Sequence, residues 1–325
     1  MIFIMSNNFD SATNWVTQYL NYYGIDFFRY NAESEIKEIS ISIDTGSVEV
    51  IIELLNGHKI DVARTEVFWY RRGDFNIVKP FNNDTEEKKR ILNSENKKVK
   101  QFMHEVLESR STHKLSSISH DRDVNKLSNL ILAENCGMKI PKTIITSSKE
   151  NVVKFSNDDI ITKPMDNNFI FVENNLISAV GTSLISGNMK TELPDKFYIS
   201  KFQRNIKKLF EVRMFYFFGK ISSLAIFSQD SDSSRIDSRN ELKRTPNRRT
   251  VLETPKNLQE KVRVFMRTLN FETGSLDFIV TPSYDFIFLE VNPIGQFSGV
   301  SYFGNFYIEK EIALWISNSL NLKNK

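Results

Sequence analysis

The chain contains one cysteine, Cys136, and only four histidines among its 325 residues. A single cysteine excludes an internal disulfide framework, and so few scattered histidines argue against a zinc site. Glycine is also scarce, at 12 residues, and neither GxxxxGK(S/T) nor GxGxxG occurs. If the protein binds a nucleotide, side chains and a cation must therefore hold the phosphates in place of a glycine-rich loop.

Long apolar runs are missing as well. Segments such as Met214–Phe218 fall far short of the roughly 20 residues that a membrane helix needs. The apolar residues 1–5 lack a basic region and are followed by polar residues, so no signal peptide is expected. The net charge of +3 is small, and the basic runs lack the interleaved aromatic residues that stack on bases. We expect a cytoplasmic protein that binds neither membrane nor nucleic acid.

The most informative pattern is a pair of acidic strands near the C-terminus. The segments around Asp277 and Glu290 are predicted strands, joined by a tight turn at Ser283–Tyr284. If that turn is symmetric, Asp277 lies opposite Glu290, and Asn292 shares the face of Glu290. Opposed carboxylates repel unless a cation lies between them, and Asp, Glu and Asn oxygens suit Mg²⁺. A magnesium site is predicted; the alternative is an edge hairpin with solvated acids.

The length predicts two or three domains, and the order of the predicted strands and helices indicates mixed α/β and α+β character. Strands and helices alternate over the first seventy residues, and a charged helix over about 85–107 and a polar linker over 109–119 follow. Further helices are predicted at 121–134 and 308–319. The expected organisation is an N-terminal open α/β domain (1–115), a central α+β lid domain (116–198) and a C-terminal domain with the metal site (199–325).

Cationic side chains occur at the ends of several predicted elements. Lys126 begins a helix, Lys163 ends a short strand before a proline, and Arg213 lies in a strand. Two basic runs cover residues 201–213 and 235–249. Such residues are either part of a solvated face or part of a site for phosphates or an acidic partner.

Taken in order, these residues resemble the ATP-grasp family over essentially the whole chain. The resemblance implies a three-unit ATP-grasp fold and a carboxylate ligase that uses ATP and Mg²⁺ and releases ADP and phosphate. The segments that carry it are 125–127 with 137–141, 162–164, 202–213, 276–278 and 289–293.

The two ends of the chain resemble a narrower group, the maturases of microviridin-type peptides (graspetides), and most closely the grasp-with-spasm maturases. The matching segments are 67–72, 292–297 and 304–310. Two features depart from the pattern: Gln203-Arg204 replaces Gln-Glu in the hinge, and Gly304-Asn305 precedes the last helix without a cysteine.

This resemblance implies a ribosomal precursor peptide as partner, with a leader and a Thr/Lys/Glu-rich core. Its Asp or Glu carboxylates would be activated as acyl phosphates and closed into ester or amide rings. A homodimer is compatible with it. Two alternatives stay open: a conventional ligase that acts on amino acids or a protein tail, and a non-catalytic binding module.

The resemblance also assigns roles to individual residues. Adenine would lie against a hinge formed by Phe202, Gln203, Arg204 and Ile206. Lys163 and Lys126 would bind phosphate oxygens, and Arg213, with Lys163, would act on the transferred phosphoryl group. The metal ligands would be Asp277, Glu290 and Asn292.

Substrate contacts are expected from two arginine pairs. Arg71 and Arg72 would position a substrate carboxylate; the alternative is that they form a positively charged strand end. Arg235 and Arg239 would meet an acidic core peptide, and the polar loops 166–168 and 228–240 are predicted lids.

Overall fold

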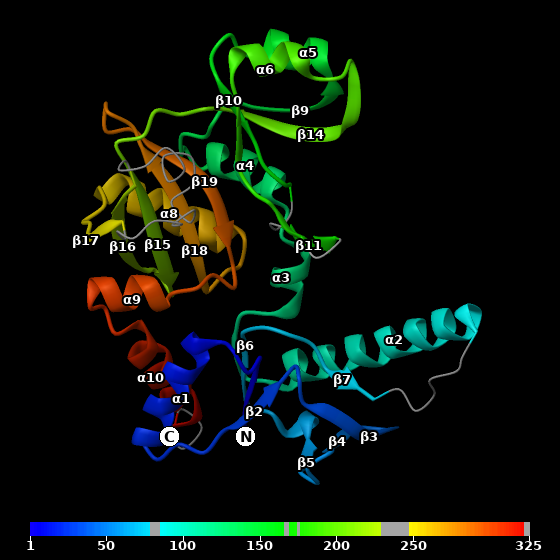
Figure 1. Ribbon diagram of the computed structural model, residues 1–325. Coiled ribbons are helices and arrows are strands. Elements are labelled where there is room, and N and C mark those ends of the chain that lie inside the picture. The colour runs from blue at the N-terminus through cyan, green and yellow to red at the C-terminus, as the bar shows by residue number, and fades with distance from the viewer. Residues whose placement is uncertain (79–84, 166–168, 174–175, 229–246, 322–325) are drawn as a thin grey trace. The chain divides into compact units, whose positions relative to one another are not determined.

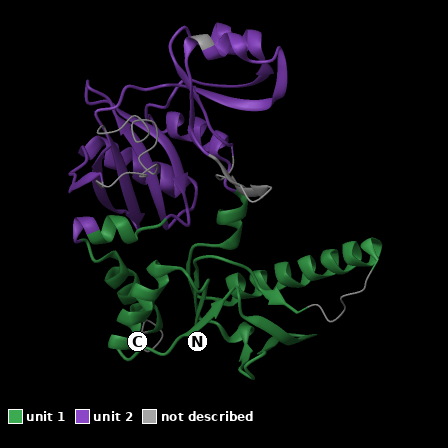
Figure 2. Cartoon of the chain, in the orientation of Figure 1, with its two compact units in different colours: residues 1–123, 296–302, 306–325 green, residues 124–295, 303–305 purple. Residues whose placement is uncertain are grey.

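The computed structural model describes residues 1–78, 85–165, 169–173, 176–228 and 247–321. The chain forms two compact units (Figure 2). Unit 1 contains residues 1–123, 296–302 and 306–325, and unit 2 contains residues 124–295 and 303–305. This division differs from the three expected ranges because the C-terminal helix packs against the first helix of the chain and so belongs to unit 1.

Unit 1 is built on a parallel sheet in the order β2-β1-β6-β8, of which β2 and β6 are labelled in Figure 1. Every residue of β1 is buried, as expected for a central strand that is covered on both faces. The strand β8 lies inside the segment that was predicted to be a linker; its three residues are too few to show a periodic pattern. The strands are β1 (Ile2–Ser6), β2 (Phe28–Asn31), β6 (Val67–Tyr70) and β8 (His113–Leu115).

A second, mixed sheet in unit 1 has the order β5-β4-β3-β7. Its strands are β3 (Glu35–Asp44), β4 (Ser47–Leu54), β5 (Lys59–Asp61) and β7 (Asn76–Ile77). The helices of this unit are α1 (Ser11–Tyr22), the short 3-10 helix Val62–Arg64, α2 (Glu86–Arg110), α3 (Ile118–Asp123) and α10 (Ile308–Asn321). The predicted long charged helix is confirmed as α2, and its buried residues lie between Met103 and Leu107.

A buried ion pair joins α1 to the end of β6. Asp10 caps α1, where its Oδ1 accepts the Thr13 N–H at 2.9 Å. Its other oxygen, Oδ2, lies 3.3 Å from Arg71 Nε and 3.0 Å from Arg72 Nε. Arg71 also donates to Gln296 Oε1 at 2.9 Å. Burial raises the pKa of the Asp10 carboxyl, but Arg71, the Thr13 N–H and Arg72 outweigh that effect and hold it below its ordinary value.

Unit 2 contains a small antiparallel sheet in the order β13-β10-β14-β9. One face packs its apolar residues, including Ile160 and Phe202, against Val152 and Phe155 of α5. The elements are β9 (Thr143–Ser148), α5 (Lys149–Phe155), β10 (Ile160–Thr162), β13 (Ser183–Ile185), α6 (Gly187–Glu192) and β14 (Lys196–Arg204), with the separate hairpin β11 (Phe169–Glu173) and β12 (Leu176–Val180).

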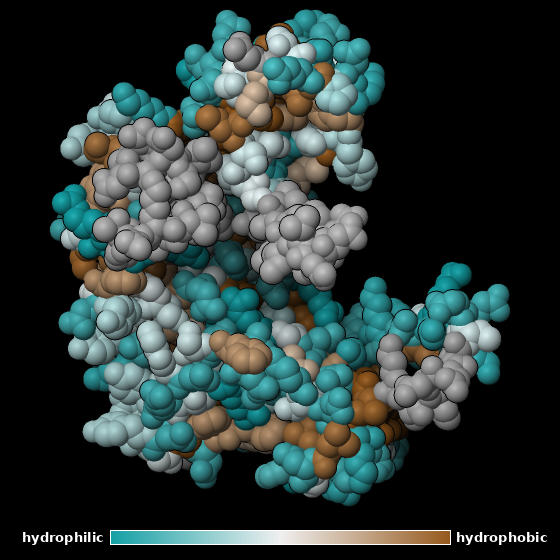
Figure 3. All heavy atoms as spheres, in the orientation of Figure 1, coloured by the Kyte–Doolittle hydropathy of each residue, from teal (hydrophilic) through white to brown (hydrophobic). Residues whose placement is uncertain are grey.

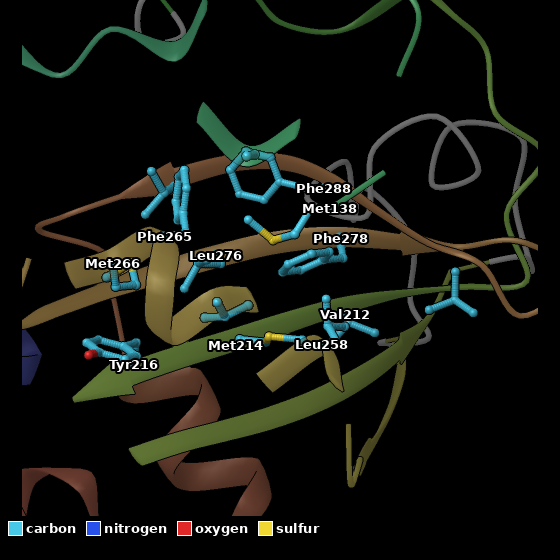
Figure 4. Close-up of a cluster of buried hydrophobic side chains, with 14 of the residues drawn as sticks. Met138, Val212, Met214, Tyr216, Leu258, Phe265, Met266, Leu276, Phe278 and Phe288 are labelled. Carbon is cyan, nitrogen blue, oxygen red and sulfur yellow. The ribbon is translucent and has the colours of Figure 1, made fainter. Parts of the chain in front are cut away.

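The larger sheet of unit 2 has the order β17-β16-β15-β18-β19 and is antiparallel throughout. Its core side chains, among them Met214, Leu276 and Phe278, pack with Phe265 of α8 and with Met138 (Figure 4). The elements are α4 (Lys126–Asn135), β15 (Phe210–Phe217), β16 (Lys220–Phe227), β17 (Arg248–Val251), α8 (Lys256–Thr268), β18 (Thr273–Val280) and β19 (Phe286–Asn292). Helix α9 (Ser298–Gly304) follows; its residues 298–302 belong to unit 1 and its last two residues to unit 2.

In the part of the chain that the structure describes, no helix is long and apolar enough to cross a membrane. On the face drawn in Figure 3, hydrophilic residues cover most of the visible surface, and hydrophobic residues form separate small groups.

The first prediction concerns the buried pair in unit 1. Replacing Arg71 with Met should lower the free energy of unfolding by about 3 kcal/mol, because Asp10 loses a buried partner. Arg64→Met is the matched control: Arg64 pairs with Asp61 at the surface, and its loss should cost less than about 1 kcal/mol. Urea unfolding at pH 7 measures both values.

The penalty at Arg71 should also depend on pH in one direction. Because the folded-state pKa of Asp10 is depressed, its stabilising effect is present above the ordinary value of 3.8 and is lost as the pH falls through the folded-state pKa. The difference between wild type and Arg71→Met should therefore shrink in acid. If wild type and Arg71→Met differed in free energy of unfolding by the same amount in acid as at pH 7, the ion pair would not be the cause of the difference.

Candidate functional site

Three charged side chains lie side by side across the middle of the large sheet. The register pairs Arg213 of β15 with Asp277 of β18, and Asp277 with Glu290 of β19. Directly paired residues of antiparallel strands project from the same face. Their neighbours Val212 and Phe278 project from the other face into the core (Figure 4). One face of the sheet is therefore apolar and packed, while the other carries a charged row.

The pairing of Asp277 with Glu290 is confirmed, but the reason for it differs from the prediction. The connection is a tight turn, but it lies one residue earlier than predicted: the Tyr284 N–H donates to the Thr281 carbonyl at 2.8 Å, which puts Pro282 and Ser283 at the centre of the turn. The register that leaves this turn would place Leu289 opposite Asp277. A β-bulge beside Asp277 adds one residue to β19 and brings Glu290 into position.

The same bulge reverses the alternation of side chains in β19. Phe288 packs in the core, with ring centroids 5.2 Å from Phe265 and 5.5 Å from Phe278. In a regular strand Glu290 would project from the same face as Phe288, two residues earlier. The bulge separates them, so the core keeps its aromatic residue and the charged row keeps its carboxylate.

Cations from three elements compensate the two carboxylates. Lys126 Nζ lies 3.3 Å from Glu290 Oε2, and Lys163 Nζ lies 3.8 Å from the same oxygen. Arg213 Nη1 lies 3.7 Å from Asp277 Oδ1. These side chains keep between 16% and 29% of their surface exposed, so they are sheltered but accessible to a ligand.

Lys126 owes its position to a break between two helices. A single helix was predicted at 121–134, but the chain instead forms α3 and α4 with a cap between them. Asn125 Oδ1 accepts the backbone N–H groups of Leu127 and Ser128 at 2.9 and 3.2 Å. This cap makes Lys126 the first residue of α4 and brings its ammonium group to Glu290.

Lys201 is a buried cation that the sequence analysis left within a basic run. Its residue is 3% exposed, and its Nζ donates to the Pro164 carbonyl at 3.1 Å. Its own carbonyl accepts the Thr162 hydroxyl at 3.0 Å. Burial lowers the pKa of the Lys201 ammonium to about 8, and nearby Lys163 contributes to the same shift. A lysine within a strand gives no sequence signal that it points inward.

Glu211 is a second residue that the sequence analysis did not assign. It lies two residues before Arg213 in β15, and both residues line the pocket that is described next. Its carboxylate pairs with the ammonium of Lys208, whose side chain is 4% exposed. The charged face of the sheet thus extends beyond the row.

A pocket of about 80 Å³ is lined by residues from both sheets of unit 2. The small sheet contributes apolar and amide side chains, and the large sheet contributes the charged row with apolar neighbours. Its lining includes Ile161, Lys163, Gln203, Arg213, Ile279, Leu289 and Glu290.

The predicted hinge residues divide between several environments. The Phe202 side chain packs in the core of the small sheet, so a contact from it to a nucleotide would come from its backbone. Gln203 lines the pocket and donates to Thr143 Oγ1 at 3.0 Å. Arg204 pairs with Asp158 at the surface at 2.7 Å, and together with Ile206 it borders a different pocket of about 850 Å³.

The oxygen donors of the site fit a magnesium ion. Asp277 and Glu290 present carboxylates from paired positions, and Mg²⁺ prefers such oxygen ligands. Asn292 Oδ1 accepts the Ile294 N–H at 3.0 Å, and its second lone pair is left for a cation. Among the described residues no three His, Cys, Asp or Glu side chains form a metal cluster. The remaining ligands would have to be amide, water or phosphate oxygens.

Gly295 closes the turn that follows β19, the strand that carries Glu290 and Asn292. Its N–H donates to the Asn292 carbonyl at 3.1 Å. A Cβ at this position would lie 2.3 Å from Ser275 Cβ and 2.8 Å from the Ser275 backbone nitrogen. Only glycine fits this approach of the turn to β18 without displacing one of them.

Of the predicted substrate residues, Arg71 and Arg72 lie in unit 1, and the other two lie outside the residues that the structure describes. Arg71 is buried in unit 1 with Asp10 and Phe297, whereas Arg72 keeps 37% of its side chain exposed. Their role in substrate binding stays a prediction. Arg235 and Arg239, the predicted lid loop 166–168, and the predicted lid loop 228–240 except Ser228 lie outside the described residues.

No family model and no curated protein matches the chain. Among solved structures, similarity covers nearly its whole length. A RiPP-associated ATP-grasp ligase from Chryseobacterium gregarium, solved with ADP and a leader and core peptide, is 22% identical, with 98% of this chain and 96% of that chain covered and a TM-score of 0.83. The macrocyclase MdnC from Microcystis aeruginosa, bound with the precursor peptide MdnA, is 24% identical. The match covers 98% of this chain and 100% of that chain, with a TM-score of 0.79.

The ATP-grasp ligase PsnB, solved with a minimal precursor, Mg and ADP, is 16% identical, with 98% of this chain and 97% of that chain covered and a TM-score of 0.71. These likenesses establish the fold: the chain has the ATP-grasp fold, as the order of its motifs predicted.

The second prediction tests the turn that follows β19 and contains Gly295. Gly295→Ala should destabilise the protein by about 2 kcal/mol, because the added Cβ overlaps Ser275. It should also weaken nucleotide binding in the presence of Mg²⁺, since Asn292 is held by the same turn.

Gly299→Ala is the control for this prediction. Gly299 has nothing within 4 Å of the added Cβ and lies in α9, so alanine should be neutral or slightly stabilising. Thermal unfolding with and without Mg-ADP measures both effects. If the two variants had equal thermal stability and gained equally from Mg-ADP, the turn would not support the site.

Proposed function

We propose that the protein is an ATP-dependent peptide maturase that activates Asp or Glu side chains of a ribosomal precursor peptide and closes ester or amide rings. The observation that carries this proposal is the charged row of Arg213, Asp277 and Glu290, with Lys126 and Lys163 at Glu290. Carboxylates for a metal and cations for phosphates, gathered on one sheet face, match the needs of phosphoryl transfer.

The chain's own residues would bind the substrate ATP as follows. Lys126 and Lys163 would exchange the Glu290 carboxylate for phosphate oxygens, because both ammonium groups already lie within 4 Å of that carboxylate. Asp277, Glu290 and Asn292 would hold Mg²⁺, which neutralises charge on the β- and γ-phosphates when bound. Arg213 lies in the middle of the sheet beside Asp277, where it would stabilise charge on the transferred phosphoryl group.

The hinge offers backbone groups for the base. The N–H groups of Arg204 and Asn205 donate to the carbonyls of Lys142 and Asp159. Within the described residues, the next N–H, that of Ile206, has no acceptor. We expect it to donate to a ring nitrogen of adenine. This contact does not require the glutamate that is replaced by Arg204 here.

The reaction would proceed in two steps. A substrate carboxylate oxygen attacks the γ-phosphorus, the bond to the ADP oxygen breaks, and an acyl phosphate forms. A hydroxyl or amine of the same peptide then attacks the acyl carbon, loses its proton and expels phosphate. Each ring therefore removes one water from the peptide in total. No serine or cysteine nucleophile is needed.

Support for a peptide substrate comes from the likeness over 98% of the chain to ligases that were solved with leader, core or precursor peptides. We extend the proposal to a peptide with a Thr/Lys/Glu-rich core, to action in the cytoplasm, and to carboxylate binding by Arg71, Arg72, Arg235 and Arg239. A homodimer is compatible with the proposal.

The third prediction tests the function directly. The protein is incubated with ATP, Mg²⁺ and the small Thr/Lys/Glu-rich peptide encoded nearest to it, and the intact peptide mass is measured. We expect loss of one water per ring together with release of ADP and phosphate. Glu290→Ala should abolish the loss, because it removes a metal ligand from the charged row.

Glu311→Ala is the matched control for this experiment. Glu311 lies in α10 of unit 1, outside the charged row, and its removal should leave the mass loss unchanged. ATP consumption with a gain in peptide mass would identify a conventional ligase instead. Absence of ATP turnover with carboxylate peptides would overturn the enzymatic proposal.

A further inference from the structure

Lys201 is a buried cation for which the chain itself supplies little compensation. It lies in β14, and its residue is 3% exposed. In the described part of the chain, its ammonium group donates to one acceptor, the Pro164 carbonyl, and no carboxylate forms an ion pair with it. A buried ammonium group without an anionic partner destabilises a fold unless it has a ligand to bind.

The surroundings of Lys201 indicate what that ligand would be. Burial is the main cause of the lowered pKa of its ammonium group; the charges of Lys163 and Lys126 lower it further, and the charge of Glu290 raises it. These three residues carry the proposed phosphate and metal contacts. Gln203, two residues along the same strand face, lines the pocket. Lys201 therefore belongs to the cleft side of the small sheet, whereas Phe202 between them belongs to its core.

Lys201 is also fastened to the segment that carries Lys163. Its Nζ contacts the residue after Lys163, and its carbonyl accepts the hydroxyl of the residue before it, at 3.1 and 3.0 Å. The two ammonium groups are thus held near each other although like charges repel. An ammonium group has three N–H donors, so two remain after the Pro164 contact.

We propose that Lys201 is a third cationic side chain of the nucleotide site, and that its ammonium group binds a phosphate oxygen of the nucleotide. This inference rests on the proposed function, since it assumes that the cleft binds ATP. Together with Lys126, Lys163 and Arg213, Lys201 exceeds the charge of Asp277 and Glu290 and prepares the cleft for a polyanion. The bound phosphates, in return, supply the anionic partner that the buried lysine lacks.

The fourth prediction separates this role from a structural one. Lys201→Met removes the charge and keeps the approximate volume; Lys201→Gln also keeps a donor for the Pro164 carbonyl. Both should weaken Mg-ADP binding roughly ten-fold or more, the loss expected for a charge-assisted hydrogen bond. The ligand-free melting temperature of Lys201→Met should be unchanged or raised, because a buried charge is removed.

Lys190→Met is the matched control. Lys190 is 4% exposed, lies in α6 beside the same small sheet, and donates to the Ser156 carbonyl at 2.9 Å. It resembles Lys201 in burial and in its carbonyl contact, but it does not line the pocket at the charged row. Its ammonium group also donates to the Asp158 carbonyl, so its replacement removes two buried hydrogen bonds where Lys201→Met removes one. The replacement should therefore lower the ligand-free melting temperature and leave Mg-ADP affinity unchanged.

Isothermal titration with Mg-ADP and ligand-free thermal unfolding decide between the outcomes. Wild-type affinity in Lys201→Met, or restored affinity in Lys201→Gln, would overturn the inference, the latter because a carbonyl contact alone would suffice. An equal loss in Lys190→Met would also overturn it. If the wild type itself binds no Mg-ADP, the proposed function fails and the inference fails with it; wild-type binding with unaffected Lys201 variants removes the inference alone.

Discussion

Two carboxylates held opposite each other on neighbouring strands, Asp277 and Glu290, are the constraint on which the rest of the site depends. Such a pair is repulsive in a sheet unless positive charge lies close by. Here Arg213 compensates Asp277 from the next strand, and Lys126 and Lys163 approach Glu290 from outside the sheet. The helix break before α4 and the strand end after β10 are thereby tied electrostatically to the same position.

This arrangement has a consequence for nucleotide binding. The lysines that would bind phosphates are paired with a carboxylate that would bind the metal. In the proposed complex, Glu290 would bind Mg²⁺ in place of the two lysines, and Lys126 and Lys163 would bind phosphate oxygens in place of Glu290. Each side chain would exchange its partner for another of the same sign, so no charge would be left uncompensated. Binding of the nucleotide and of Mg²⁺ should consequently be coupled.

Much of this site could be predicted from the sequence. The motif order indicated the ATP-grasp fold, and the two-residue periodicity of strands placed Glu290 and Asn292 on one face. The opposition of Asp277 and Glu290 was also predicted, but from a turn placed one residue too late. The turn has Pro282 and Ser283 at its centre, which alone would pair Asp277 with Leu289, and a bulge at Leu289 restores the pair. Single-residue shifts of this kind leave no mark in a hydrophobic pattern.

Other features depend on tertiary contacts that a sequence pattern does not carry. Lys201 belongs to a basic run that reads as a solvated face, yet it is buried because the small sheet faces the charged row. The return of α10 to unit 1 follows from its packing against α1, far away in the sequence. The short strand β8 was taken for a linker because three residues show no period.

The coupling between metal and nucleotide tests the account most directly. ADP affinity is measured by titration calorimetry with and without Mg²⁺, for the wild type and for Glu290→Gln. We predict that Mg²⁺ tightens ADP binding to the wild type. In the variant this gain should disappear, whereas ADP binding without Mg²⁺ should be as tight as in the wild type or tighter, because Lys126 and Lys163 are released from Glu290. An undiminished effect of Mg²⁺ in Glu290→Gln would contradict the assignment of the charged row as the metal and phosphate site.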